Sequence, residues 1–148
     1  MQKEILQNIL TQNQMTCSFT FNKLTAENAA FRLTEQSASA GFYYRHVGEI
    51  IYLLATFLGV STDVQNTTMG ETDTGQGKDI DASKELIEKG FAMLEKLIEE
   101  TPESDWLETI ETPFFGTISR IRLFSHILFH NSNHTGQISL ILAKGRKM

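Results

Sequence analysis

The stretch Leu123-Phe-Ser-His126-Ile-Leu-Phe-His130-Asn-Ser-Asn-His134-Thr-Gly-Gln-Ile138 contains three of the four histidines of this protein, and the fourth is His46. Its apolar residues recur at helical spacing, which predicts an α-helix with one face in the core. His130 and His134 occupy that face, between Ile127 and Ile138. Because they are four residues apart, their imidazoles point about 40° from one another around the helix axis. Two imidazoles placed in this way can bind one metal ion.

Apolar spacing outside this stretch predicts three further long helices. The first covers about residues 2–24, and the second covers 39–58, with Ser37 or Ser39 as its cap and Gly59 at its end. The third starts at Asp81 as N-cap and ends before Pro102, and the histidine-containing helix runs from after Gly116 to near the C-terminus. The chain of 148 residues is therefore predicted to be all-α, a four-helix bundle forming a single domain over residues 1–148.

Two connections stand out. Residues 61–80 are rich in threonine and glycine and form a long loop between the second and third helices. This loop is long enough to run the length of the bundle, and it is either solvated and inert or part of a substrate entrance. The segment 106–116 is expected to form a short extended piece over one end of the bundle.

Composition restricts the possible functions. The net charge of −5, with scattered basic residues, argues against nucleic-acid binding. No window approaches the roughly 18 apolar residues of a membrane span. The single cysteine allows no intramolecular disulfide, and the N-terminal residues do not resemble a signal peptide. We therefore expect a cytoplasmic protein that binds no membrane.

His46 lies on the apolar face of the second helix, between Phe42 and Ile50. A buried imidazole costs free energy unless it is hydrogen-bonded or ligated. Inward-facing histidines on two helices of a bundle could meet at one metal ion. The zincin motif needs a glutamate where this chain has Asn131, and di-iron bundles need Glu-x-x-His where this chain has His46-x-x-Glu49. A mononuclear site with three imidazoles and one open position fits better, and it suits zinc or nickel.

Other residues near these histidines have two interpretations each. His126 is too far along the helix to share the ion easily, so it packs, supports a ligand or lines a pocket. Glu49 is a candidate orienting group or catalytic base, or else it forms a surface salt bridge. Cys17 is predicted to be a buried structural thiol. Gly136 could permit close approach of a neighbouring helix, and Gln137 either supports a ligand or is solvated.

Three segments together resemble the DinB-like family, which is grouped with YfiT-type metal-dependent hydrolases. His130-x-x-x-His134-Thr-Gly-Gln-Ile is close to the family motif H-x-x-x-H-R-G-Q-[IL]. Arg45-His46-Val-Gly-Glu-Ile-Ile lies where the family has its first ligand, and Thr112-Pro-Phe-Phe-Gly-Thr-Ile-Ser resembles the segment before its last helix. The chain departs from the pattern at Thr135, where arginine is frequent; this position is expected to face away from the metal.

The resemblance implies an up-down-down-up helix order, a metal ion held by His46, His130 and His134, and a homodimer. Characterised relatives include thiol transferases and a thiol-dependent isomerase. The expected activity is therefore metal-dependent activation of a water or a low-molecular-weight thiol, for hydrolysis of, or transfer to, a small electrophile. The alternative is a non-catalytic, stress-related dimeric bundle in which the metal only joins two helices. Such a closed site would need a fourth protein ligand, and Glu49 or His126 could supply it.

Overall fold

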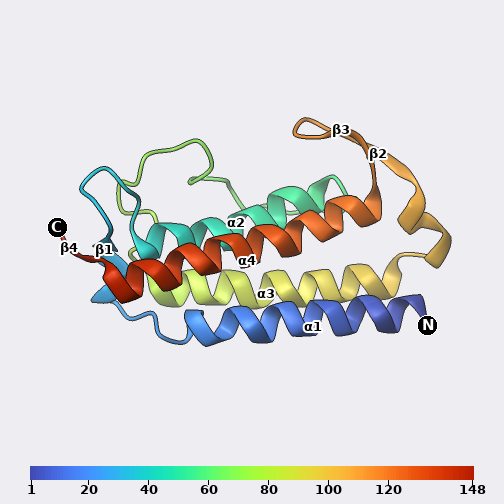
Figure 1. Ribbon diagram of the computed structural model, residues 1–148. Helices are drawn as coiled ribbons and strands as arrows, with labels where there is room; N and C mark the ends of the chain where they lie inside the picture. The colour runs from blue at the N-terminus through green and yellow to red at the C-terminus, as the bar shows by residue number, and fades with distance from the viewer.

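The computed structural model describes residues 1–148 and is mostly helical. Its four long helices are α1 (Gln2–Phe21), α2 (Ala40–Thr56), α3 (Ile80–Glu100) and α4 (Arg120–Lys144). Figure 1 shows the helices lying alongside one another, with α2 and α3 running in one direction and α1 and α4 in the other. Helix α2 packs against both α3 and α4, and α1 packs against α3 and α4. Side chains on the facing sides of α2 and α4 can therefore meet.

Short elements occupy the two ends of the helices. The 3₁₀ turns are η1 (Asn28–Ala30) and η2 (Glu103–Leu107). Strand β1 (Phe31–Arg32) pairs antiparallel with β4 (Arg146–Lys147), and β2 (Thr109–Thr112) pairs antiparallel with β3 (Gly116–Ser119). The all-α prediction thus misses two small sheets, although β2 lies within the segment 106–116 that is expected from the sequence to be extended. Helix α4 begins only at Arg120 because the residues after the β2–β3 turn are paired in the hairpin.

The helix ends follow local capping chemistry. Of the two serines proposed for α2, Ser39 is the cap, and its hydroxyl accepts a hydrogen bond from the Phe42 amide at 3.2 Å. The predicted cap of α3 is wrong by two residues, because Asp79 and not Asp81 accepts from the Ala82 amide, at 2.9 Å. Helix α1 ends at Phe21, three residues earlier than expected.

The core contains the apolar faces predicted for the four helices. Each helix contributes several residues that are at most 9% exposed, and no helix is long and apolar enough to cross a membrane. Ile5 and Ile9 on α1 lie outside this core, with about half of each side chain exposed. Examples of the core residues are Leu6, Leu10, Cys17, Ile51, Leu54, Ile87, Phe91, Leu94, Ile98, Leu123, Ile127, Ile138 and Ile141.

The long connection between α2 and α3 covers residues 57–79 and returns along the outside of the bundle (Figure 1). Asp73 fastens it to α2, because its carboxylate accepts from the Ser39 amide at 2.8 Å and pairs with Arg32 at 3.0 Å. Near the start of α3, a Cβ added to Gly77 would lie 1.9 Å from the Gly41 carbonyl oxygen. Only glycine permits so close an approach. The connection is therefore held tightly against α2, beside His46.

Candidate metal centre

Three half-buried histidines from two helices converge between α2 and α4. His46 lies halfway along α2, and His130 and His134 lie one turn apart on the facing side of α4. One ring nitrogen from each residue lies within 4.8 Å of the other two. The Nε2 atoms of His46 and His130 are 3.1 Å apart. The structure thus brings together the three residues that the sequence suggests.

Thr68, from the connection 57–79, fixes the tautomer of His46. The Thr68 hydroxyl lies 3.0 Å from His46 Nδ1 and 2.7 Å from Glu49 Oε2. A hydroxyl carries one proton, and a carboxylate can only accept, so Thr68 donates to Glu49. Thr68 must therefore accept from a protonated Nδ1 of His46. The lone pair of His46 is then on Nε2, the atom that faces the other two histidines.

Glu49 supports this arrangement by accepting the hydrogen bond of Thr68, and it is only 1% exposed. The interpretation of Glu49 as a surface residue is wrong, although its salt bridge exists, to Arg45 at 2.8 Å. Burial by itself raises the pKa of Glu49, but hydrogen bonds from Arg45, Thr67 and Thr68 lower it below its usual value. Both carboxylate oxygens already accept hydrogen bonds. Glu49 therefore orients His46 through Thr68.

His134 is held in a similar way from the other side. Its Nδ1 lies 2.6 Å from Gln137 Oε1, an oxygen that only accepts, so Nδ1 carries the proton and Nε2 carries the lone pair. Tyr43 of α2 stacks on the His134 ring, with centroids 5.4 Å apart and planes inclined by 26°. Of the two interpretations of Gln137, the structure favours support of a histidine.

The electrostatics keep these histidines neutral. Burial, strengthened by the neighbouring His134, lowers the pKa of His46 to about 4. Burial and the other histidines lower the pKa of His130 to about 3. Burial also lowers the pKa of His134, although the hydrogen bond to Gln137 acts in the opposite direction. Neutral imidazoles with free lone pairs are the form that binds metal ions.

The cluster has the donor atoms to bind a metal ion, and one pair of them has a suitable separation. Two nitrogen ligands of an ideal tetrahedral zinc site are separated by about 3.3 Å, close to the 3.1 Å between His46 and His130. Two lone pairs at that distance repel each other unless a proton or a cation lies between them. His130 Nδ1 is buried and has no hydrogen-bond partner in the protein, so no hydrogen bond at this atom restrains the orientation of the ring. Three neutral nitrogens are a donor set typical of zinc or nickel.

A cavity of about 290 Å³ adjoins the cluster. His46 and His130 form part of its wall, and most of the remainder is apolar. His126 also lies on this wall, with its ring centroid 6.4 Å from that of His130, so it lines the cavity, one of the roles expected for it. The residues lining the cavity are His46, Ile50, Leu53, Leu54, Met69, Phe114, Phe115, His126 and His130.

The other sequence expectations have mixed outcomes. Cys17 is a buried free thiol, as predicted, and burial raises its pKa. Thr135 is also buried, and its hydroxyl donates to the Asn131 carbonyl at 2.6 Å. The prediction for Gly136 is wrong, because no neighbouring atom lies within 4 Å of where its Cβ would be.

Several residues of the site were not foreseen from the sequence. Thr67 and Thr68 come from a loop without periodicity, and Tyr43 and Phe114 look like ordinary packing residues in the sequence. No local pattern marks the two threonines as partners of Glu49, because they are about twenty residues away from it in the chain.

Comparison with known families agrees with this arrangement. No curated protein matches the chain. A family model described as the DinB superfamily matches residues 9–138, a range that includes all three clustered histidines and the four long helices in large part. On that match, which covers most of its length, the chain belongs to the DinB superfamily.

Proposed function

We propose that this protein is a metal-dependent enzyme in which His46, His130 and His134 hold one divalent ion, zinc or nickel. The reaction would be hydrolysis of a small electrophile, or transfer of a low-molecular-weight thiol to it. The observation that carries the proposal is the convergence of three neutral imidazoles beside an apolar cavity. When bound, the metal would lower the pKa of a water or thiol and so supply a nucleophile near pH 7.

The residues of this chain would have distinct roles in that reaction. Thr68 and Gln137 hold His46 and His134 with their Nε2 lone pairs toward the ion. The apolar side chains of Ile50 and Leu53 in the cavity wall exclude water from the electrophile, which strengthens electrostatic interactions there. Glu49 is a positioning residue in this scheme, because its oxygens are occupied by Arg45, Thr67 and Thr68.

The non-catalytic alternative has less support. A purely structural zinc site has four protein ligands. Glu49 is committed to its hydrogen bonds, and the ring of His126 lies 6.4 Å from that of His130. A coordination position is therefore left for a small molecule, and the adjoining cavity offers room for one. This favours an enzyme over a non-catalytic bundle in which the metal only joins two helices.

We further infer that the helices form the DinB-like up-down-down-up bundle, and that the protein is a homodimer acting on a small molecule. Family membership and the parallel course of α2 and α3 support the first inference. The second inference, of a homodimer that acts on a small molecule, rests on the resemblance to the DinB-like family.

Elemental analysis of tag-free protein tests the metal centre directly. We expect about one zinc or nickel per chain, lost in a His130→Ala/His134→Ala double variant that keeps its helical circular dichroism. His126→Ala is the matched control, because it removes the same side chain from the same helix outside the cluster, and it should retain the metal. Absence of metal from wild-type protein, even after incubation with either ion, would refute the proposal.

Catalysis needs a separate assay. Metal-loaded protein would be incubated with a panel of small electrophiles, with and without a low-molecular-weight thiol, and product formation followed by mass spectrometry. We expect turnover that depends on the metal and disappears in the double variant. A metal-loaded protein inactive on the whole panel would favour the non-catalytic alternative.

A further inference from the structure

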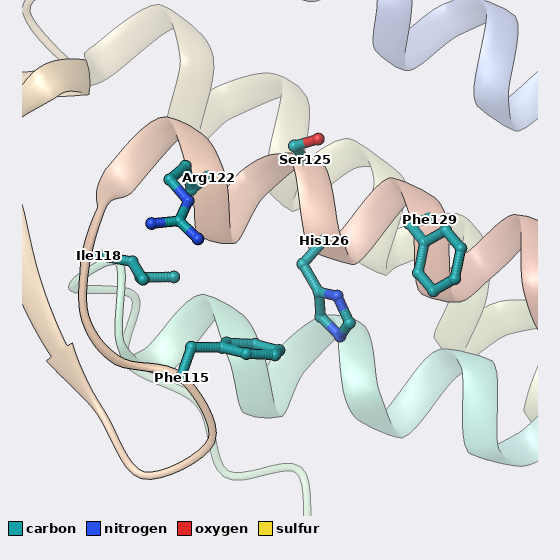
Figure 2. Close-up of a pocket in the computed structure, with 6 residues that line it drawn as sticks. All are labelled: Phe115, Ile118, Arg122, Ser125, His126 and Phe129. Carbon is teal, nitrogen blue, oxygen red and sulfur yellow. The ribbon is translucent and has the colours of Figure 1, made fainter.

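A second cavity, of about 410 Å³, lies beside the cavity of the histidine cluster. Figure 2 shows the residues that line it, with Arg122 and His126 on α4 facing side chains of the β2–β3 hairpin region. The two cavities share Phe115 and His126, whose rings meet edge to face with centroids 4.6 Å apart. The two cavities therefore adjoin at these two side chains. The full lining is Phe115, Ile118, Arg122, Ser125, His126 and Phe129.

The two cavities differ in charge. The one beside the cluster has no charged side chain in its wall, whereas the second has the guanidinium of Arg122. Arg32 and Arg45 are paired with carboxylates. In contrast, Arg122, like Arg120 and Arg146, forms no ion pair. The first turn of α4 contains no acidic residue that could compensate it. Arg122 is exposed to solvent, and three of the other five lining residues are hydrophobic. A guanidinium without an intramolecular partner, beside apolar side chains, is suited to a planar oxyanion.

The spacing along α4 sets the length of a ligand that could use both cavities. Arg122 and His130 are eight residues apart, which is about 12 Å along a helix axis. His126 lies halfway between them, and Phe115, with 43% of its surface exposed, covers the same region from the hairpin. A molecule with an anionic end at Arg122 and an apolar body across Phe115 and His126 would reach the histidine cluster.

We propose that the substrate of this site is a small amphiphilic carboxylate, held by Arg122 at its charged end and by the apolar cavity at its reacting end. This inference rests on the proposed function, because it takes the histidine cluster to be where the reaction occurs. Arg122 is a specificity-determining residue in this scheme. The bidentate fork of its guanidinium matches the geometry of a carboxylate, which a neutral analogue lacks.

Binding of 4-phenylbutyrate, compared with 4-phenyl-1-butanol, tests the carboxylate preference without any reaction. Calorimetric titration of metal-free protein should give a Kd for the acid about two- to fivefold lower than for the alcohol, as expected for an ion pair at a solvent-exposed arginine. Arg122→Gln should abolish this difference. Arg146→Gln, the same substitution at an exposed arginine outside both cavities, should preserve it. Equal affinities in wild-type protein, or a preference that survives Arg122→Gln, would overturn the proposal.

Cobalt-loaded protein tests the orientation of the ligand. If Co²⁺ is held at the cluster, its paramagnetism should relax the phenyl protons of 4-phenylbutyrate faster than the methylene protons next to the carboxylate. The reverse order would overturn the proposal while leaving the metal centre intact. Failure of the wild-type protein to bind Co²⁺, zinc or nickel would instead refute the proposed function, and with it the assignment of this carboxylate as a substrate.

Discussion

The hydroxyl of Thr68 connects a buried carboxylate to a clustered histidine, so Thr68→Val should weaken metal binding without touching a ligand. Valine has nearly the same shape as threonine but can neither donate nor accept a hydrogen bond. The substitution removes the 2.7 Å bond to Glu49 and the 3.0 Å bond from His46 Nδ1. His46 then loses the partner that fixes its tautomer and ring orientation.

The size of the effect follows from these two contacts. Thr68 is 2% exposed, so water cannot easily replace the lost hydroxyl. Loss of a hydrogen bond to a charged group costs about 1.5–3 kcal/mol of folding free energy, and Glu49 keeps its bonds to Arg45 and Thr67. Removal of a group that supports a ligand typically lowers metal affinity about 10–100-fold. We expect a zinc affinity lower by that factor, which corresponds to about 1.4–2.7 kcal/mol.

Competition against a chromophoric zinc chelator would measure this affinity, and urea unfolding would measure stability. Thr67→Val is the matched control, because the Thr67 hydroxyl also donates to Glu49, at 2.7 Å, but does not contact His46. Both variants should be destabilised, whereas only Thr68→Val should lose zinc affinity by more than tenfold. Equal zinc affinities for the two variants would refute the argument that Glu49 acts on His46 through Thr68.

Three further predictions concern stability and assembly. Burial raises the pKa of Asp73, but hydrogen bonds from Ser39 outweigh burial and hold this pKa below its ordinary value of 3.8. The ionised Asp73 therefore stabilises the folded state fully above pH 3.8, and this stabilisation is lost as the pH falls through the lower pKa of the folded state. The difference in unfolding free energy between wild type and Asp73→Asn should therefore shrink as the pH is lowered from about 5 to about 2, as followed by urea titration at each pH; a constant difference would contradict it. Gly77→Ala should lower the free energy of unfolding, measured by urea titration, by about 1–3 kcal/mol, because its Cβ meets the Gly41 carbonyl. Gly136→Ala should raise this free energy slightly, because that helical position is open. Light scattering should give a mass of twice 16.7 kDa for the expected homodimer, and a monomer mass would refute that expectation.

Helical periodicity predicts most of this fold because each long helix buries one continuous apolar face. Leu6 and Leu10 on α1, or Ile87 and Phe91 on α3, are buried where the spacing places them. The same logic indicates that His46, His130 and His134 face inward, since each occupies a position that its apolar neighbours define. Convergence then follows from the packing of α2 against α4.

What sequence reasoning missed depends on contacts between distant segments. The β2–β3 hairpin forms because residues 109–112 find partners at 116–119, which delays the start of α4. The hydrogen-bond partners of Glu49 could not be foreseen, because Thr67 and Thr68 come from an aperiodic loop. Gly136 suggests close packing by its residue type alone, yet its position on α4 faces open space.

The connection 57–79 joins α2 to α3 and, in addition, supplies the residues that orient His46. Asp73 and Gly77 fasten it to the start of α2, and Thr67 and Thr68 reach Glu49 one turn past His46. The orientation of His46 thus depends on a loop that no periodic pattern constrains, whereas His130 and His134 are placed by α4 itself. Substitutions that loosen the loop, such as Asp73→Asn, should consequently reduce zinc affinity through His46 even though Asp73 lies outside the cluster. An Asp73→Asn variant that loses stability but binds zinc as tightly as wild type would show that Thr67 and Thr68 hold their positions without the Asp73 anchor.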